Sequence, residues 1–156
     1  EEAKVDALLD ECVDHIQLQL ESKNGTLQKH YRDGGVKLMV DRNHFLNTVI
    51  NILDNAIKYS IGAPEIKVVT ERTREHLILI ISDKGLGMSK EEQKHIFDRF
   101  FRVSSGNIHN IKGHGLGLSY ARGIVEAHGG RIQVESEKNK GSKFYIYIPL
   151  PHENKS

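Results

Sequence analysis

The feature that most constrains this sequence is the run LILII at residues 77–81, which is apolar at five successive positions. A strand with one face in water alternates apolar and polar residues, whereas a strand that is apolar on both faces is typical of the middle of a covered sheet. The run is far shorter than the roughly 18 apolar residues that a membrane-spanning helix needs. We therefore expect a buried central strand with the rest of the chain arranged around it.

Helical patterns recur on both sides of this run. Apolar residues spaced three and four apart indicate amphipathic helices, and capping residues mark where two of them begin. The predicted helices are 5–23, a second that follows Asp41 as N-cap and ends at Lys58 or Tyr59, a short one capped by Ser89 and Glu92, and a third long one over 117–128.

Strand-like stretches come in pairs between the long helices. The first pair is expected to form a hairpin, because Asp-Gly-Gly at 33–35 is a turn signal. The repeated order of one helix and two strands predicts an α+β fold, a two-layer α/β sandwich. Its mixed sheet would have about five strands plus the short hairpin, with three main helices on one face. The stretches are 26–31, 36–40, 65–72, 77–81, 131–137 and 143–149.

Composition limits the classes of function. Lys plus Arg is 22 and Asp plus Glu is 21, so the net charge of +1 does not favour a nucleic-acid or membrane-surface protein. A chain of 156 residues suits a single domain, expected over 1–151 with a frayed tail at 152–156. The single cysteine, Cys12, excludes an internal disulfide and sits in an apolar helical pattern that favours the core. The first residues do not resemble a signal peptide, and we expect the chain to be a piece of a larger protein.

The second predicted helix has a polar stripe that a solvated surface does not require. At about 100° per residue, Asn51, Asn55 and Lys58 fall within a stripe roughly 60° wide. Amide oxygens can bind a hard cation such as Mg²⁺, and an ammonium one turn further on can meet phosphates. An exposed amphipathic helix with incidental asparagines stays open as the alternative. The opposite, apolar side is formed by Val49, Ile52, Leu53 and Ala56.

Two glycine-rich segments follow. The first, 83–87 (DKGLG), comes directly after the buried strand, where glycines let a ligand approach the backbone and Asp83 can accept from an amine such as that of adenine. An ordinary turn is the alternative there. The second, 113–118 (GHGLGL), opens the third long helix, where free N–H groups and the helix dipole attract anions. It is not a P-loop, because no Gly-Lys-Ser/Thr follows.

Taken in order, four segments resemble the motifs of a known family. The segments 51–60 (NILDNAIKYS), 83–88 (DKGLGM), 97–102 (FDRFFR) and 113–118 (GHGLGL) resemble the N box, first glycine box, F box and second glycine box of sensor histidine kinases. These kinases belong to the GHKL superfamily, whose ATP-binding fold is called the Bergerat fold. The resemblance covers nearly the whole chain and implies an ATP-binding catalytic domain that uses ATP and Mg²⁺.

The resemblance also implies roles for individual residues in the first two boxes. Asn55 would hold Mg²⁺, with Asn51 supporting the metal and the phosphates. Lys58 and Tyr59 would face the phosphate groups, and Asn55 and Lys58 would share in catalysis. Asp83 would accept a hydrogen bond from the adenine amino group.

Further residues are implied around the base and over the phosphates. Gly85 and Gly87 would shape the adenine pocket and hinge a lid, and Arg102 would act in catalysis by reaching the terminal phosphate. The polar stretch 104–112 is expected to be mobile. Phenylalanines anchoring the lid would be Phe97, Phe100 and Phe101. The second glycine box would cover the triphosphate with Gly113, His114, Gly115, Leu116, Gly117 and Leu118.

One departure from the family pattern bears on partners. Sensor histidine kinases carry a phosphoacceptor histidine on an upstream dimerisation helix, and neither His15 nor His30 has that context. The resemblance therefore implies that the partners are the protein's own dimerisation and histidine phosphotransfer domain and a response regulator receiver domain. It implies a monomeric isolated domain, a homodimeric full-length protein, and a place in the bacterial cytoplasm, with the full-length protein free or anchored in the inner membrane.

Three alternatives remain at this point. ATPases of the same superfamily place a water-activating Glu where this chain has Asn51, which cannot act as a general base. Anti-sigma-factor serine kinases and mitochondrial protein kinases are disfavoured by the segment 97–102 and by Lys58 and Tyr59. A nucleotide-sensing domain without catalysis is disfavoured by the intact set of polar and glycine positions.

Overall fold

The computed structural model describes residues 2–32, 36–98 and 117–151 of the chain. Within these ranges the helices are α1 (Val5–Ser22), α2 (Arg42–Lys58), α3 (Lys90–His95) and α4 (Gly117–Ala127). The strands are β1 (Glu2–Lys4), β2 (Thr26–Tyr31), β3 (Lys37–Met39), β4 (Glu65–Arg72), β5 (His76–Asp83), β6 (Arg131–Glu137) and β7 (Gly141–Pro149).

Five strands form one mixed sheet in the order β2-β4-β5-β7-β6. Only the pair β2–β4 is parallel, and the other neighbours are antiparallel. The predicted central strand, β5, lies in the middle of this sheet, while β1 and β3 form a separate antiparallel pair. The predicted α+β class and the mixed five-stranded sheet are confirmed.

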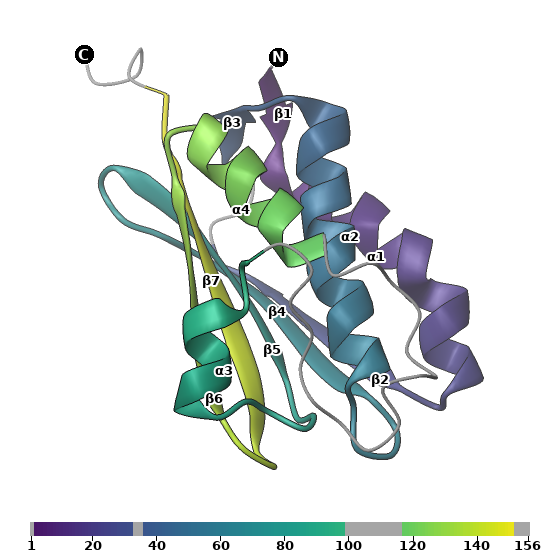
Figure 1. The fold of residues 1–156 in the computed structure, drawn as a ribbon. Coiled ribbons are helices and arrows are strands. Elements are labelled where there is room, and N and C mark those ends of the chain that lie inside the picture. The colour runs from purple at the N-terminus through teal and green to yellow at the C-terminus, as the bar shows by residue number, and fades with distance from the viewer. Residues whose placement is uncertain (1, 33–35, 99–116, 152–156) are drawn as a thin grey trace.

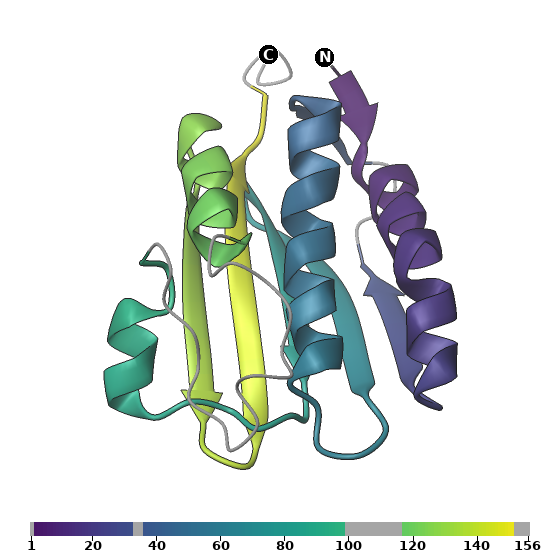
Figure 2. The ribbon, with the colours of Figure 1, turned by 45° about the vertical axis from the view of Figure 1, so that its right-hand side comes forward.

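The three long helices form a single layer on one face of the sheet. Helices α1, α2 and α4 lie side by side across it, and α3 lies at one end beside β6 (Figures 1 and 2). The core lies between these two layers, with fully buried side chains such as Leu9 from α1, Leu53 from α2 and Leu79 from β5. The apolar side predicted for α2 faces this core, because Val49, Ile52, Leu53 and Ala56 are all buried.

The predicted hairpin between 26–31 and 36–40 is wrong. Strand β2 pairs in parallel with β4, from Thr26 opposite Glu65 onward, and β3 pairs with β1 instead. The physical reason is burial: Leu38 of β3 is fully buried in the core cluster that α1 also contributes to, and its cross-strand partner is Ala3. A turn signal indicates a chain reversal, but the burial of side chains selects the pairing partner.

The expectation that β5 is covered on both faces is also wrong. Its residues alternate between buried Leu77, Leu79 and Ile81, which face the helices, and half-buried Ile78 and Ile80, which face the other way. In the part of the chain that the structure describes, no second layer covers that face, and neighbouring side chains provide the partial burial. On this open face Ile78 is opposite Tyr147, and Ile80 is opposite Tyr145.

The predicted helix N-caps and the predicted burial of the cysteine are confirmed. The Asp41 carboxylate accepts from the backbone N–H of His44 at 3.1 Å, and Ser89 with Glu92 forms a reciprocal capping box. Cys12 is buried, and this burial raises the pKa of its thiol to about 12. Among the residues in the three described ranges, no helix is long and apolar enough to cross a membrane.

Candidate functional site

The candidate site lies where the C-terminal half of α2 meets the end of β5. The carbonyl oxygen of Tyr59, the C-cap residue of α2, accepts from the backbone N–H of Leu86 at 2.9 Å. A Cβ on Gly85 would clash with that same carbonyl oxygen. The first glycine segment is therefore packed directly on the end of the helix that carries the polar stripe.

Gly87 has a second reason to be glycine. Its φ is +65°, in the left-handed region that L side chains rarely adopt, and a Cβ there would clash with the carbonyl oxygen of Glu137. Beside it, the backbone N–H of Asn139 donates to the carbonyl of Leu86 at 2.6 Å. Close backbone approach thus joins this segment to the β6–β7 turn as well as to α2.

Asp83 is held at the end of β5 by backbone groups. Its Oδ1 accepts from the N–H of Gly85 at 2.8 Å, and Ser142 is its cross-strand partner on β7. Burial raises the pKa of this carboxyl, while the backbone N–H groups of Gly85 and Ser142 oppose the rise. A half-buried carboxylate of this kind keeps acceptor positions for a donor on a ligand.

A mostly apolar cavity of ≈ 40 Å³ brings parts of three predicted motifs together. This is about the volume of one water molecule in the liquid, so the cavity as described is smaller than a purine. Phe97 lies nearby, with its ring centroid 6.3 Å from that of Phe144 in an edge-to-face arrangement. The lining residues are Asn55, Ala56, Tyr59, Asp83, Leu86, Gly87, Met88, Ile96, Leu118, Ser142 and Phe144.

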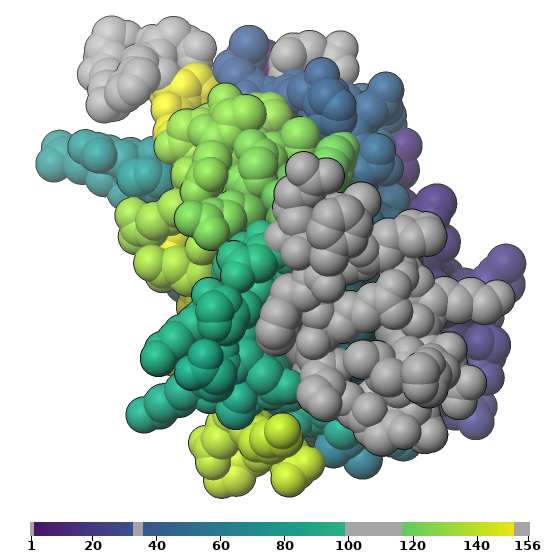
Figure 3. Space-filling view, in the orientation of Figure 1, coloured from purple at the N-terminus to yellow at the C-terminus, as the bar shows by residue number. Residues whose placement is uncertain are grey.

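The start of α4 is brought against the polar stripe of α2. The Asn51 side-chain amide donates to the carbonyl of Gly117, the first residue of α4, at 3.5 Å. Figure 3 shows α4 and α3 on the same face of the molecule. The positive end of the α4 dipole therefore lies beside Asn51, which favours an anion at this place.

Lys58 has a partner within its own helix. Its ammonium lies 2.9 Å from a carboxylate oxygen of Asp54, and its side chain is 29% exposed. The other carboxylate oxygen of Asp54 accepts from the Gln19 amide at 2.9 Å, which ties this pair to α1. Lys58 must therefore leave or share Asp54 if it is to meet a phosphate.

The donors present suit a hard cation. Within the three described ranges, no cluster of three or more His, Cys, Asp or Glu side chains could hold a metal ion by itself. Asn55, half-buried at the cavity, instead supplies an amide oxygen, and Asn51 lies one turn before it. Mg²⁺ is commonly bound by few protein oxygens together with waters and phosphate oxygens, so Asn55 fits that mode of binding.

A larger hollow of ≈ 720 Å³ lies at the same end of the sheet, lined partly by side chains of the open face. Charges of both signs line it, including Lys67, Lys143 and Glu135. None of the asparagines of α2 reaches it, and among the predicted site residues that the structure describes only Asp83 does. We therefore place the candidate nucleotide site in the smaller cavity, where the motifs meet.

Several predicted site residues lie outside the described part of the chain. These are Phe100, Phe101, Arg102, Gly113, His114, Gly115 and Leu116, together with the stretch 104–112. Conversely, sequence reasoning gave no site role to the cavity residues Met88, Ile96, Ser142 and Phe144. The position of Ser142 opposite Asp83 depends on the pairing of β5 with β7, which no local pattern in the sequence specifies.

Comparison with known proteins identifies relatives in sequence. The family model "Histidine kinase-, DNA gyrase B-, and HSP90-like ATPase" matches residues 40–152. The sensor protein RprX of Bacteroides fragilis is 37% identical over 153 residues, which are 96% of this chain and 29% of RprX. The histidine-protein kinase ArlS of Staphylococcus epidermidis is 38% identical over 125 residues, 80% of this chain and 27% of ArlS. The chain thus spans less than a third of the length of either relative.

Solved structures show the same fold. The catalytic domain of histidine kinase ThkA superposes with a TM-score of 0.84 at 26% identity, covering 96% of this chain and 95% of that one. A mycobacterial sensor histidine kinase, MprB, gives a TM-score of 0.83 at 24% identity, covering 96% and 98% of the two chains. Another structure, with a TM-score of 0.81 at 24% identity, holds ThkA in complex with the response regulator TrrA and covers 99% of this chain and 43% of that one.

Proposed function

Because the chain belongs to the family of histidine kinase-, DNA gyrase B- and HSP90-like ATPases, we propose that it binds ATP and presents the γ-phosphate to a histidine on a separate domain of its parent protein. Its sequence relatives and its fold are those of the ATP-binding catalytic domain of two-component sensor histidine kinases. The phosphoryl transfer, the acceptor and the partners are the proposed part, since the relatives are much longer than this chain.

One observation carries the proposal. Asn55 of α2, Asp83 at the end of β5 and Leu118 of α4 are far apart in the sequence and line one cavity. A carboxylate that accepts from an amine, an amide oxygen for a hard cation and a helix N-terminus for phosphate are the three kinds of group that a nucleoside triphosphate needs. An ordinary turn at 83–87 or an incidental asparagine would not explain their convergence.

Each group has a proposed task in binding. Asp83 accepts from the adenine amine, Asn55 would hold Mg²⁺ with Asn51 in support, and the first turn of α4 attracts the phosphates. Bound Mg²⁺ would neutralise part of the charge on the phosphate oxygens. Lys58 would contribute a positive charge at the phosphates, Tyr59 a wall of the cavity, and Arg102 a further positive charge at the terminal phosphate.

The transfer itself needs little covalent chemistry from this chain. A neutral imidazole nitrogen of the acceptor histidine forms the new N–P bond, the bond between the γ-phosphorus and the bridging oxygen breaks, and ADP leaves with that electron pair. The contribution of this chain is to hold the γ-phosphate in line with the incoming nitrogen. The imidazole loses its proton to solvent or to a base on the acceptor domain.

A simple ATPase is the second candidate within the family. An ATPase needs a general base that activates the attacking water. In this chain the side chain one turn before Asn55 is Asn51, an amide that donates to the carbonyl of Gly117. General-base assistance is worth roughly 10² to 10⁴ in rate, so an amide in that place favours long-lived bound ATP. The same observation favours an acceptor that comes from another domain.

The test separates these candidates. Radiolabelled ATP with Mg²⁺ is added to the 156-residue chain alone and together with the dimerisation domain of its parent protein. We expect acid-labile label on the added domain and slow turnover without it. Label on this chain alone, or turnover of several per second without a partner, would assign the chain to another branch of the family.

Further partners follow from the same proposal. A histidine phosphorylated in this way would pass its phosphoryl group to the receiver domain of a response regulator, the kind of protein that ThkA is complexed with. Since ATP and such regulators are cytoplasmic, we propose that the site faces the cytoplasm of a bacterial cell. We propose a monomer for the isolated chain and a homodimer for the full-length protein.

A further inference from the structure

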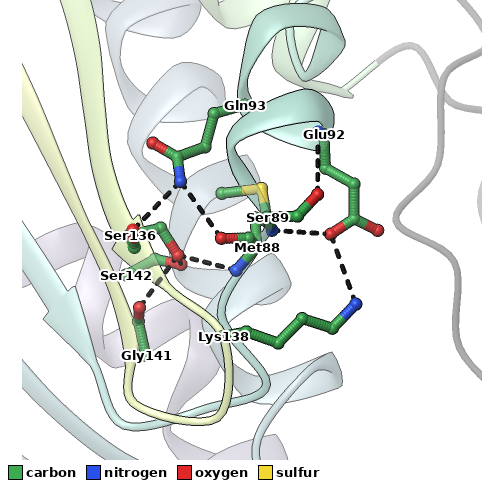
Figure 4. Close-up of polar contacts among 8 residues, drawn as sticks. All are labelled: Met88, Ser89, Glu92, Gln93, Ser136, Lys138, Gly141 and Ser142. Atoms are coloured by element: carbon green, nitrogen blue, oxygen red, sulfur yellow. Dashed lines mark hydrogen bonds and ion pairs between the residues drawn. The ribbon is translucent and has the colours of Figure 1, made fainter.

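A hydrogen-bonded cluster joins α3 to the β6–β7 hairpin beside the cavity, and the proposed chemistry does not use it (Figure 4). The hydroxyl of Ser136 accepts from the backbone N–H of Met88 at 2.8 Å and donates to the carbonyl of Gly141 at 2.9 Å. The hydroxyl of Ser142 lies 2.8 Å away. A hydroxyl has one hydrogen and two acceptor positions, so these contacts use all three and make Ser142 the donor of the last.

Gln93 makes the second half of the cluster. Its side-chain nitrogen donates to the carbonyl of Met88 at 3.1 Å and to the carbonyl of Ser136 at 3.0 Å, as Figure 4 shows. Helix α3 has only six residues, and so short a helix is not stable by its own hydrogen bonds. Its capping box closes the first turn, and the bonds of Gln93 and Ser136 attach that turn to the β6–β7 hairpin, together with an ion pair of 3.8 Å between Glu92 and Lys138.

One side of this cluster faces the cavity. Met88 and Ser142 both line it, and Ser142 is the cross-strand partner of Asp83, whose carboxylate its backbone N–H helps to hold. The cluster therefore runs without interruption from the carboxylate proposed to bind adenine to the first turn of α3. In the sequence, α3 comes shortly before the segment 99–116.

We propose that Ser136 and Gln93 are positioning residues for nucleotide binding, which hold Met88 and α3 against the adenine pocket without touching the nucleotide. This inference rests on the proposed function, because it assumes that the cavity beside Asp83 receives the base. Neither residue lines the cavity, so any effect of changing them on affinity must act through Met88, Ser142 or α3.

The experiment is calorimetric titration of the 156-residue chain with ATP and with ADP in the presence of Mg²⁺. Ser136→Ala leaves the buried N–H of Met88 without its acceptor, and we expect about a three- to tenfold loss of affinity. Ser136→Thr keeps the hydroxyl on a strand that favours β-branched residues, and should restore binding. Gln133→Ala, an exposed position on the open face of the same strand, is the matched control and should bind as the wild type does.

Gln93 gives an independent variant that does not alter the sheet. Gln93→Ala should weaken binding to a similar degree, and Gln93→Glu should weaken it more, because a carboxylate would face two carbonyl oxygens. If both residues act through α3, adding Gln93→Ala to Ser136→Ala should cost less than about a further twofold, since contacting residues are not additive. Hydrogen exchange should rise at 88–95 and stay unchanged in β4 and β5.

The outcomes distinguish the two levels of inference. A wild-type chain that binds neither nucleotide overturns the proposed function and this inference with it. Variants that bind both nucleotides like the wild type overturn the positioning role alone. A loss of affinity accompanied by faster exchange throughout the sheet also overturns it, because Ser136 would then support the fold as a whole.

Discussion

The two ends of the candidate site are built differently. At the adenine end, Asp83 is held by backbone N–H groups, and Gly85 and Gly87 pack so closely on other backbone that no side chain fits. At the phosphate end, Asn51 and Lys58 are half-buried side chains on one face of a helix, joined to Gly117 at 3.5 Å and to Asp54 at 2.9 Å.

This difference indicates which part of the site is rigid. Backbone contacts across β5, β7 and the end of α2 cannot shift without moving the sheet, so the base would meet a preformed acceptor. Side chains on a helix face can change rotamer on the nanosecond timescale or faster, so the phosphate end can adapt to Mg²⁺ and to the γ-phosphate as they arrive. Changes at the adenine end should therefore have larger effects on both folding and binding.

The largest effect is expected for Gly87→Ala. Alanine in the left-handed region costs about 1–2 kcal/mol, and the clash of its Cβ with the Glu137 carbonyl should bring the loss in free energy of unfolding to about 2–4 kcal/mol. Gly62→Ala is the matched control, because Gly62 has a similar φ of +70° but open space around a Cβ. Urea denaturation measures both, and equal losses for the two variants would contradict close packing at Gly87.

The next largest effect is expected for Asp83→Asn. Replacing the charged acceptor should weaken ATP binding by about ten- to a hundredfold. The same change should stabilise the chain at neutral pH without nucleotide, because burial raises the pKa of Asp83 and so makes its charged form unfavourable in the folded state. Calorimetry and thermal unfolding report the two effects, with the exposed carboxylate change Glu65→Gln as control. Unchanged ATP affinity would remove adenine binding from this residue.

A smaller effect is expected at the phosphate end for Lys58→Ala. The ammonium is partly exposed and already paired with Asp54, so its attraction for phosphate is screened, and ATP affinity should fall by about three- to tenfold. Adenosine, which has no phosphate, should bind equally well to both forms. Asp54→Asn, which removes this charged partner, should leave ATP affinity unchanged or raise it. An equal loss for adenosine and ATP would show that Lys58 supports the helix rather than the phosphates.

The smallest effect concerns pH. Because burial raises the pKa of Asp83 above 3.8, its charged form is lost at a higher pH than that of an exposed aspartate. As pH falls to that pKa, wild-type affinity for ADP should fall by about twofold, and it should reach the affinity of Asp83→Asn only well below that pKa. Protonation of the nucleotide affects both chains alike, so the ratio of their affinities isolates Asp83. A ratio that is constant down to the ordinary pKa of aspartate would contradict its burial.

For the apo chain the same carboxyl has the opposite effect. Its folded-state pKa is raised, so its contribution to stability is fully present below the unfolded pKa and is lost as pH rises through the folded pKa. Asp83→Asn should accordingly reduce the fall in stability between mildly acidic and neutral pH. Thermal unfolding of both chains across that interval measures the difference.

Much of this architecture could be predicted from local patterns. Asp41 and Ser89 begin helices as their capping signals indicate, and β4 and β6 have the predicted bounds 65–72 and 131–137. The polar and apolar sides of α2 are where helical periodicity places them. These features depend on residues within one or two turns of each other, which sequence patterns describe well.

The wrong predictions concern the pairing of strands and the covering of the two faces of the sheet. The turn signal in the sequence at 33–35 gives no information about pairing partners, and the short strand β1, which pairs with β3, was not predicted. The run at 77–81 was taken as covered on both faces, although cross-strand neighbours such as Tyr145 and Tyr147 suffice to shield Ile78 and Ile80 partly. For the candidate site, the motifs predict Asp83 and Asn55, which line one cavity, whereas the positions of Ser142 and Ser136 beside it depend on strand register.

The parallel pairing of β2 with β4 has a consequence for the order of folding. In the main sheet the antiparallel pairs β4–β5 and β6–β7 are hairpins with short connections, whereas β5 and β7 are far apart in the sequence. The strands of the parallel pair are also separated, because the whole of α2 lies between Thr26 and Glu65 in the chain. Closing so long a segment costs entropy before any hydrogen bond of the pair forms. We therefore expect β2 to pair with β4 after the hairpins β4–β5 and β6–β7 have formed. Because β5–β7 closes a still longer segment, Asp83 should meet Ser142 last, so that the candidate site is completed late in folding.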